Sequence, residues 1–251
     1  MQYNLSSGIN LGRVKIDMSG NWKETRPDEE KIKNSVSAEK VTTFSFPNTN
    51  IQISNIDDYV PGIKKLLKSS KFNISINRDK KNTVSLTGQK YSSNSNSIRI
   101  SPTLDLKFKN GLGINIRSGY SRNEQDSERS YRLKTHSESY DIGVTGSYSL
   151  MPTAKGLPFP FLGSLKWTTP ITLKASFTMQ NNKEVSINLS TMNEEIRRNN
   201  RNITFSLSGN YDFSNMVSGG LSVNYRNYLN RKITNDVTTS YGAMFNIVFK
   251  F

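Results

Sequence analysis

Apolar side chains recur at every second position over long stretches of this sequence. The clearest stretch is the last one, in which the intervening positions are small or polar. Its apolar parity holds Tyr241, Phe245, Ile247, Phe249 and Phe251. Successive side chains of a strand point to opposite faces of a sheet, so a period of two predicts strands. Counted along the chain, the pattern predicts an all-β protein of about ten or eleven strands.

Similar alternation marks the other predicted strands. They are 72–88, 98–108, 112–117, 140–150, 171–189, 203–213 and 221–226, with weaker patterns over 2–10, 13–23 and 41–56. Two of them, 72–88 and 171–189, keep their phase across a polar middle. Each is predicted to be one long strand, with a hairpin at Lys80–Asn82 or Asn181–Lys183 as the alternative. The parity reverses around Gly12, which predicts a turn or a bulge there.

The connections between the predicted strands fall into two kinds. Polar, charged connections are expected at 24–40, 122–136, 190–201 and 230–236. More compact ones are expected at 109–111, 214–218, 152–166 and 56–70, the last with a short helix insert over 57–69 on the periplasmic side. If the strands run up and down, all polar connections lie at one end of the sheet and all compact ones at the other.

The intervening parity carries full charges near strand midpoints, whereas the alternate parity is apolar over about ten residues. The residues predicted to face water in a lumen are Lys174, Asn224, Arg226 and Asn246. A sheet with hydrocarbon on one side and water on the other has to leave no backbone edge in lipid. The pattern therefore predicts an antiparallel up-and-down transmembrane β-barrel, or the open part of a larger one, in the bacterial outer membrane. A soluble all-β sandwich is the alternative.

Aromatic residues gather near the ends of the predicted strands. One group is Trp167, Phe213 and Phe251, and the other is Tyr91, Tyr120, Tyr140 and Tyr241. Such positions predict two interfacial girdles. The Phe-terminated last strand resembles the signal by which outer-membrane barrels are recognised by the barrel assembly machinery, which we therefore expect as a partner.

Composition excludes several classes of protein. The 251 residues are 34% hydrophobic, below the roughly 45–50% typical of globular domains, so a conventional core is not expected. The 11 Tyr, 12 Phe and 2 Trp are too many for a typical disordered chain. With no Cys and one His, His136, neither an enzyme nor a metal or cofactor site is expected. The net charge of +14 is spread over loops and strands, which favours lipid and lipopolysaccharide as partners over nucleic acid.

Three segments resemble the SprA/Sov family in their order along residues 40–251. They are SNIDDYVPGIKKLLKSSKFNISINRDKKNTVSL, the strand pair and polar loop over 101–150, and GLPFPFLGSLKWTTPITLKASFTMQNNKEVSINL. Members of that family are very large outer-membrane barrels that form the protein-conducting translocon of type IX secretion in Bacteroidota, and some support gliding motility.

The resemblance implies that residues 1–251 are a single barrel segment, the C-terminal part of such a translocon. Its role would be a passive polar conduit for protein export, with secreted cargo and other type IX components as partners. Residues 1–20 lack the features of a signal peptide, which agrees with a fragment. Of the two strand counts considered, eleven would be odd, which a complete bacterial barrel avoids. The alternatives are a complete small barrel, porin-like or structural, and an envelope enzyme built on a barrel.

Overall fold

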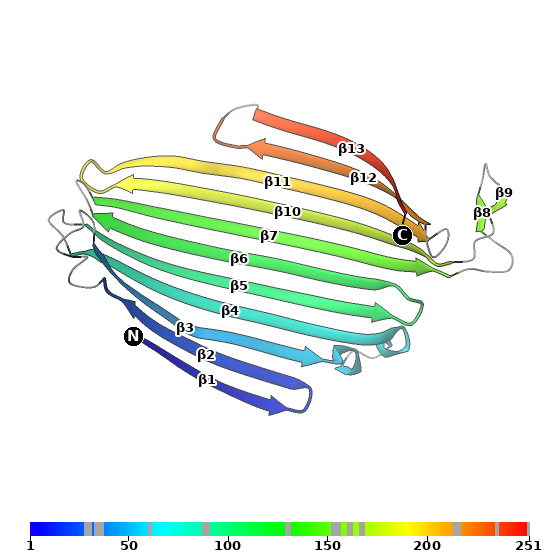
Figure 1. The fold of residues 1–251 in the computed structure, drawn as a ribbon, viewed down its shortest axis with the longest axis horizontal. Coiled ribbons are helices and arrows are strands. Elements are labelled where there is room, and N and C mark those ends of the chain that lie inside the picture. The colour runs from blue at the N-terminus through cyan, green and yellow to red at the C-terminus, as the bar shows by residue number, and fades with distance from the viewer. Residues whose placement is uncertain are drawn as a thin grey trace.

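A computed structural model shows one large sheet and one small one (Figure 1). It describes residues 1–27, 32, 38–59, 62–86, 91–128, 132–151, 157–159, 163–165, 169–212, 217–233 and 236–249. The strands of the large sheet are β1 (Gln2–Leu11), β2 (Val14–Thr25), β3 (Glu39–Ser54), β4 (Leu67–Ser85), β5 (Ser92–Phe108), β6 (Gly113–Glu128), β7 (Arg132–Leu150), β10 (Ile171–Asn188), β11 (Asn193–Asp212), β12 (Val217–Asn230) and β13 (Asp236–Phe249). The small sheet pairs β8 (Leu157–Phe159) with β9 (Gly163–Leu165).

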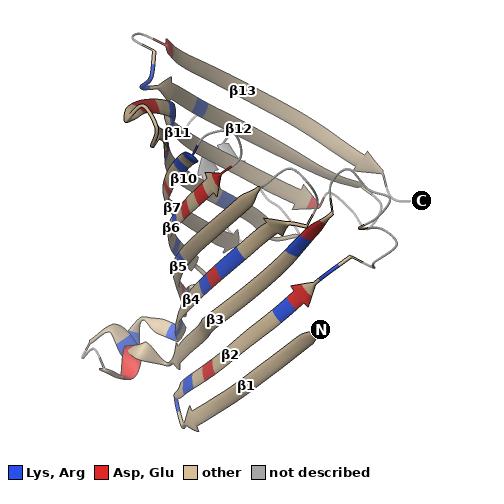
Figure 2. Ribbon diagram, turned by 90° about the vertical axis from the view of Figure 1, so that its left-hand side faces the viewer, with Lys and Arg blue, Asp and Glu red and all other residues tan. Residues whose placement is uncertain are grey.

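The large sheet is an antiparallel meander of eleven strands, in which each strand pairs with the strands before and after it. The small sheet is inserted between β7 and β10, which are direct neighbours. The large sheet curves but does not close, and β1 and β13 form its two edges (Figures 1 and 2). The predicted fold class is confirmed in its open form, as part of a barrel wall.

The two strands predicted to keep their phase across a polar middle are continuous in the structure. β4 and β10 are each one continuous strand, so the hairpins considered at Lys80–Asn82 and Asn181–Lys183 are not formed. Residues 80–82 pair with β3 on one side and β5 on the other, which satisfies their backbone groups in both directions. The turn expected at Gly12 is confirmed, with a φ of 68°.

The predictions of two polar connections are wrong. Most of 122–136 belongs to β6 and β7, and β11 begins at Asn193 within the connection expected at 190–201. Alternation marks a strand only where its two faces meet different surroundings. Where both faces are polar, a strand has no such signature, and these ends of β6, β7 and β11 have polar residues of both parities.

The cross-strand register divides the large sheet into two faces. Residues directly opposite each other in a ladder share a face. One row of such residues crosses all eleven strands and is apolar throughout: Leu11, Val14, Ile53, Phe72, Leu104, Ile116, Val144, Phe177, Phe205, Tyr225 and Tyr241. We call the face that carries this row the apolar face.

The adjacent row lies on the opposite face, which we call the polar face. It holds Asn10, Lys15, Gln52, Asn73, Thr103, Arg117, Gly143, Thr178, Thr204, Arg226 and Ser240. No member of this row is apolar apart from the glycine. The pattern read from single strands therefore holds across the whole width of the sheet.

The apolar face is not covered by protein. Among the described residues, the buried hydrophobic side chains are Ala38, Leu67 and Val185. On β11, Phe205 and Leu207 are 41% and 46% exposed, while the intervening Ser206 and Ser208 are half-buried. This is the reverse of a sheet in water, and it suits a sheet whose apolar side contacts hydrocarbon. None of the helices in the described ranges has the length and apolar character needed to cross a membrane.

Candidate functional site

The polar face is the candidate functional surface, and its side chains are tied to one another along the sheet. The Asn115 amide donates to the Asp105 carboxylate at 2.6 Å, from β6 to β5. The hydroxyls of Ser176 and Ser206 lie 2.7 Å apart between β10 and β11. The Arg226 Nε donates to the Asn202 side-chain oxygen at 3.1 Å. These bonds leave a surface of small polar groups, with charges of both signs among them.

Glycines on this face make room for polar side chains of the neighbouring strands. Arg117 lies over Gly143, where an added Cβ would be 2.6 Å from the guanidinium Nε. Gly220 lies between Asn210 and Asn246, and a Cβ there would be 2.6 Å from the Asn246 side-chain oxygen. Two pockets also hollow the polar face, one of about 520 Å³ beside β1 to β4 and one of about 410 Å³ beside β3 to β6. The face is therefore uneven and open to water.

The register places all four residues predicted to face a lumen on the polar face. Lys174 lies between Ser147 and Ser208, and Asn224 lies between Ser206 and Gly242. Arg226 and Asn246 lie on the same face of β12 and β13. That this face borders a lumen stays a prediction.

The predicted assembly signal lies on the edge strand β13. Tyr241, Phe245, Ile247 and Phe249 share the apolar face, and Phe251 lies outside the described residues. The ring of Tyr241 is 5.3 Å from the ring of Tyr225 on β12. All four apolar-face side chains are at least 49% exposed, so β13 presents them on one face beside its free edge. Their use as a signal stays a prediction.

Aromatic residues mark one border of the apolar face. Tyr120 and Tyr140 are cross-strand partners with ring centroids 4.9 Å apart, as expected for a girdle. Tyr3 and Trp22 form a second pair at 5.6 Å, which the sequence analysis missed because the weak pattern of the first two strands hid their register. The opposite group, Trp167, Phe213 and Phe251, lies outside the described residues.

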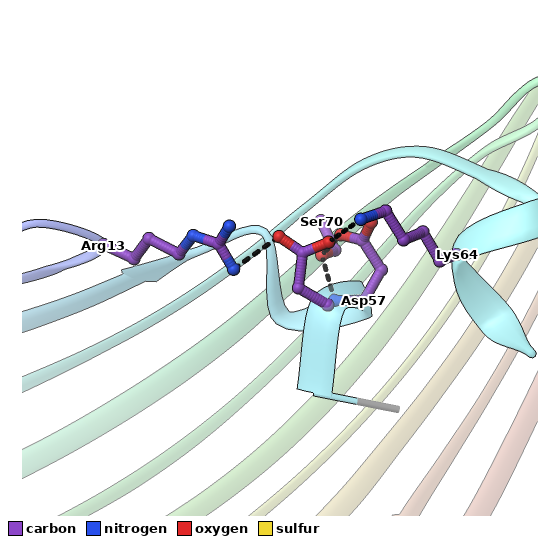
Figure 3. A network of polar contacts seen from close by, with 5 residues as sticks. Arg13, Asp57, Lys64 and Ser70 are labelled. Carbon is purple, nitrogen blue, oxygen red and sulfur yellow. Dashed lines mark hydrogen bonds and ion pairs between the residues drawn. The ribbon is translucent and has the colours of Figure 1, made fainter. Parts of the chain in front are cut away.

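The insert between β3 and β4 is held by a network of polar contacts (Figure 3). It contains two 3₁₀ helices, η1 (Ile56–Tyr59) and η2 (Ile63–Lys65), and β4 begins at Leu67 inside the range expected for one helix. The Asp58 carboxylate forms ion pairs with Arg13 of the β1–β2 turn and with Lys64 of η2, the latter at 2.8 Å.

Hydrogen bonding to Lys64 has the largest effect and holds the pKa of Asp58 below its ordinary value; desolvation opposes it, and the charges of Arg13 and Lys64 add to the lowering. The Ser70 hydroxyl donates to the Asp57 carboxylate and accepts a hydrogen bond from the Asp57 backbone N–H at 3.0 Å. The insert is thereby attached to β4 and to the β1–β2 turn.

The described residues contain no group of three His, Cys, Asp or Glu side chains arranged to hold a metal ion. His136, expected in a charged loop, lies in β7 with its Nε2 3.1 Å from Glu138 Oε1. Its position in a strand follows from the extension of β7 beyond the predicted boundary.

Two uncovered faces of opposite character on a long antiparallel meander define the wall of an outer-membrane β-barrel, here as an open sheet. Its fold is similar to the alcaligin outer-membrane receptor FauA of Bordetella pertussis, with 9% identity and a TM-score of 0.58 over 97% of this chain and 36% of that one. It is also similar to the hemophore receptor HasR of Serratia marcescens, solved as a double mutant with its hemophore HasA and heme, with 10% identity and a TM-score of 0.56 over 98% of this chain and 40% of that one.

The chain thus spans well under half the length of either receptor. At these identities the likeness shows the fold alone. It is a likeness to receptor barrels of the outer membrane, the compartment expected from the sequence. No protein-family model and no curated protein matches the sequence.

Proposed function

We propose that this chain forms one sector of the wall of an outer-membrane protein-secretion translocon of the SprA type, and that its role is passive. The observation that carries the proposal is the uninterrupted polar row across eleven strands, set back to back with an uninterrupted apolar row. Such a wall separates lipid from an aqueous path.

The polar face suits a polypeptide in transit. Its charges have both signs, with Arg117 and Arg226 on one row and Asp105 on the next, so it neither strongly attracts nor repels one kind of segment. Small hydroxyl and amide side chains fill the rows between them and offer hydrogen bonds that water can replace. A gate would be supplied by other segments or partners.

The free edges favour a sector of a larger barrel over a complete small one. β1 and β13 each pair on one side only among the described residues, and each unsatisfied backbone group in hydrocarbon costs several kcal/mol. Edge strands that stay free are usually protected by charged residues. β1 has no charged residue and β13 has one, Asp236, at its first position (Figure 2). These edges are suited to pairing with further strands.

A cross-linking experiment tests the conduit. A photoactivatable residue at Thr204 on the polar face is expected to capture secreted protein during export in the intact cell. The same residue at Phe205, one position away on the apolar face, is expected to capture lipid. Equal capture of secreted protein at both positions, or none at Thr204, would contradict the proposal.

A second experiment tests the sector against the complete small barrel. The chain has no Cys, so introduced pairs report without interference. Cysteine at Ser240 combined in turn with cysteine at Asn4 or Ser6 is expected to form no disulfide, because the edges do not meet. Cysteines at the direct partners Ser206 and Asn224 provide the positive control, since paired strands bring Cα atoms within bonding range. A disulfide between the edges supports the small barrel.

A further inference from the structure

The apolar face changes character beyond the Tyr120–Tyr140 pair. Ile76, Ile100, Tyr120 and Tyr140 form one cross-strand row on that face. The next row on the same face holds Arg78, Ile98, Arg122, Glu138 and Lys183. The row after that holds Lys80, Asn96, Glu124 and His136. The strands thus carry a band of charge on the face that is otherwise apolar.

A pocket of about 520 Å³ opens in this band. Its lining includes Phe44, Arg78, Lys80, Asn96, Glu124 and Lys134. Phe44 belongs to a row of aromatic cross-strand partners, Tyr3, Trp22 and Phe44, which continues directly into Lys80 on β4. The pocket therefore has one aromatic side chain, Phe44, in its lining, with cations beside it.

The pocket has an excess of positive charge. Its acidic side chains are matched locally, because Glu124 lies 2.6 Å from Arg122 and Asp126 lies 2.7 Å from Arg132. Arg78 and Lys80 are exposed, and neither forms an ion pair within the described part of the chain. Among the described residues, Arg78 has one side-chain hydrogen bond, from its Nε to the Asn96 side-chain oxygen at 3.4 Å, and none from its terminal nitrogens.

The height of the pocket matches the region of lipid phosphates. Aromatic girdles lie at the border between hydrocarbon and headgroups. Two residues of a strand span about 7 Å, so the row of Arg78 begins about one headgroup layer beyond the tyrosines. A guanidinium binds phosphate oxygens in pairs, and a neighbouring ammonium adds a point charge.

We infer that this pocket binds the phosphate groups of an anionic outer-leaflet lipid of the lipopolysaccharide class, with Arg78 and Lys80 as the phosphate ligands and Phe44 against the hydrocarbon border. The inference rests on the outer-membrane placement in the proposed function, but not on protein export. It assigns a specific lipid-binding site to the apolar face, which elsewhere only contacts hydrocarbon.

The test uses the full chain purified from membranes in detergent, with binding of purified lipopolysaccharide measured directly. The variant Arg78→Gln with Lys80→Gln is expected to weaken binding about thirtyfold, as calculated for the loss of two cations at an anionic lipid surface. The matched control is Lys71→Gln with Lys107→Gln, which removes the same charge from two exposed lysines on the polar face. The control is expected to bind nearly as well as the unaltered chain.

Three results would overturn the inference. They are unchanged binding in the Arg78 and Lys80 variant, an equal loss in the control, and full displacement of the lipid by excess inorganic phosphate, which would indicate a free-anion site. Heat-modifiable migration of each variant reports whether it has folded, and a variant that has not folded is replaced by the single Lys80→Gln change. The binding assay contains no secreted protein, so a negative result in it does not affect the cross-linking test of export at Thr204.

Discussion

Replacing Leu207 with arginine places a charge at the centre of the apolar face. On β11 the apolar parity runs from Tyr211 to Ile203, and Leu207 is its midpoint. Its cross-strand partners on the same face are Ala175 and Val223, and the protein leaves 46% of Leu207 exposed. In a membrane that exposed surface contacts lipid tails, so the substitution tests where the hydrocarbon lies.

The expected cost follows from the depth of this position. Arginine at the midplane of a transmembrane barrel costs about 2–4 kcal/mol on the lipid face, and loss of the leucine adds a smaller amount. A total of about 3–4 kcal/mol shifts the folding equilibrium by a factor of about 200–1,000. Since the whole free energy of unfolding of a domain is about 5–15 kcal/mol, this cost removes between about one fifth and about four fifths of the stability.

The assay is equilibrium unfolding by denaturant in lipid vesicles, with Ser206→Arg as the control. Ser206 is the adjacent residue on the polar face, where it loses its bond to Ser176, worth about 1 kcal/mol, and meets no hydrocarbon. We expect Leu207→Arg to be less stable than Ser206→Arg by about 2–3 kcal/mol. Equal costs, or a larger cost for Ser206→Arg, would show that the apolar face does not meet lipid.

Three further outcomes are expected. Gly143→Val should lower the free energy of unfolding by about 1–3 kcal/mol through overpacking. Gly146→Val should not, because Gly146 has open space beside it on the other face; the denaturant midpoints of the two variants test the difference. Aspartate at Phe249 together with the terminal phenylalanine should abolish heat-modifiable barrel in the outer membrane, while Asn246→Asp should be milder; normal yield of the phenylalanine variant would refute the assembly signal. Because the folded pKa of Asp58 is lowered, its contribution to the stability of the fold is present above its unfolded pKa and is lost as the pH falls through its folded pKa. The difference in melting temperature between Asp58→Asn and the unaltered chain should therefore shrink between about pH 7 and about pH 3.

The two faces were predictable from the sequence because the membrane imposes a simple rule on every strand. Phe177 and Phe205 fall on one parity and Thr178 and Thr204 on the other, and the ladder then aligns them. Each strand meets hydrocarbon on one face and water on the other, so the alternation within single strands already predicts the two faces of the whole sheet.

The strand ends beyond the apolar band were not predictable in the same way. Residues such as Glu124 and Lys134 lie in strands where both faces are polar, so the sequence has no period to read. The pocket in the charged band of the apolar face was not predictable for a related reason. Arg78, Lys80 and Phe44 come from two strands, and only the register shows that they share a face.

The direction of the edge strands limits how the wall can close. With eleven strands in a strict antiparallel meander, β1 and β13 run the same way, because alternate strands share a direction. Direct pairing of these two strands would be parallel, whereas bacterial barrels are antiparallel with an even number of strands. If the sheet is a sector of a larger antiparallel barrel, the number of strands that separate β13 from β1 around the wall has to be odd. A closed assembly with an even number of additional strands would need one parallel pair, and finding such a pair would contradict the closure argued here.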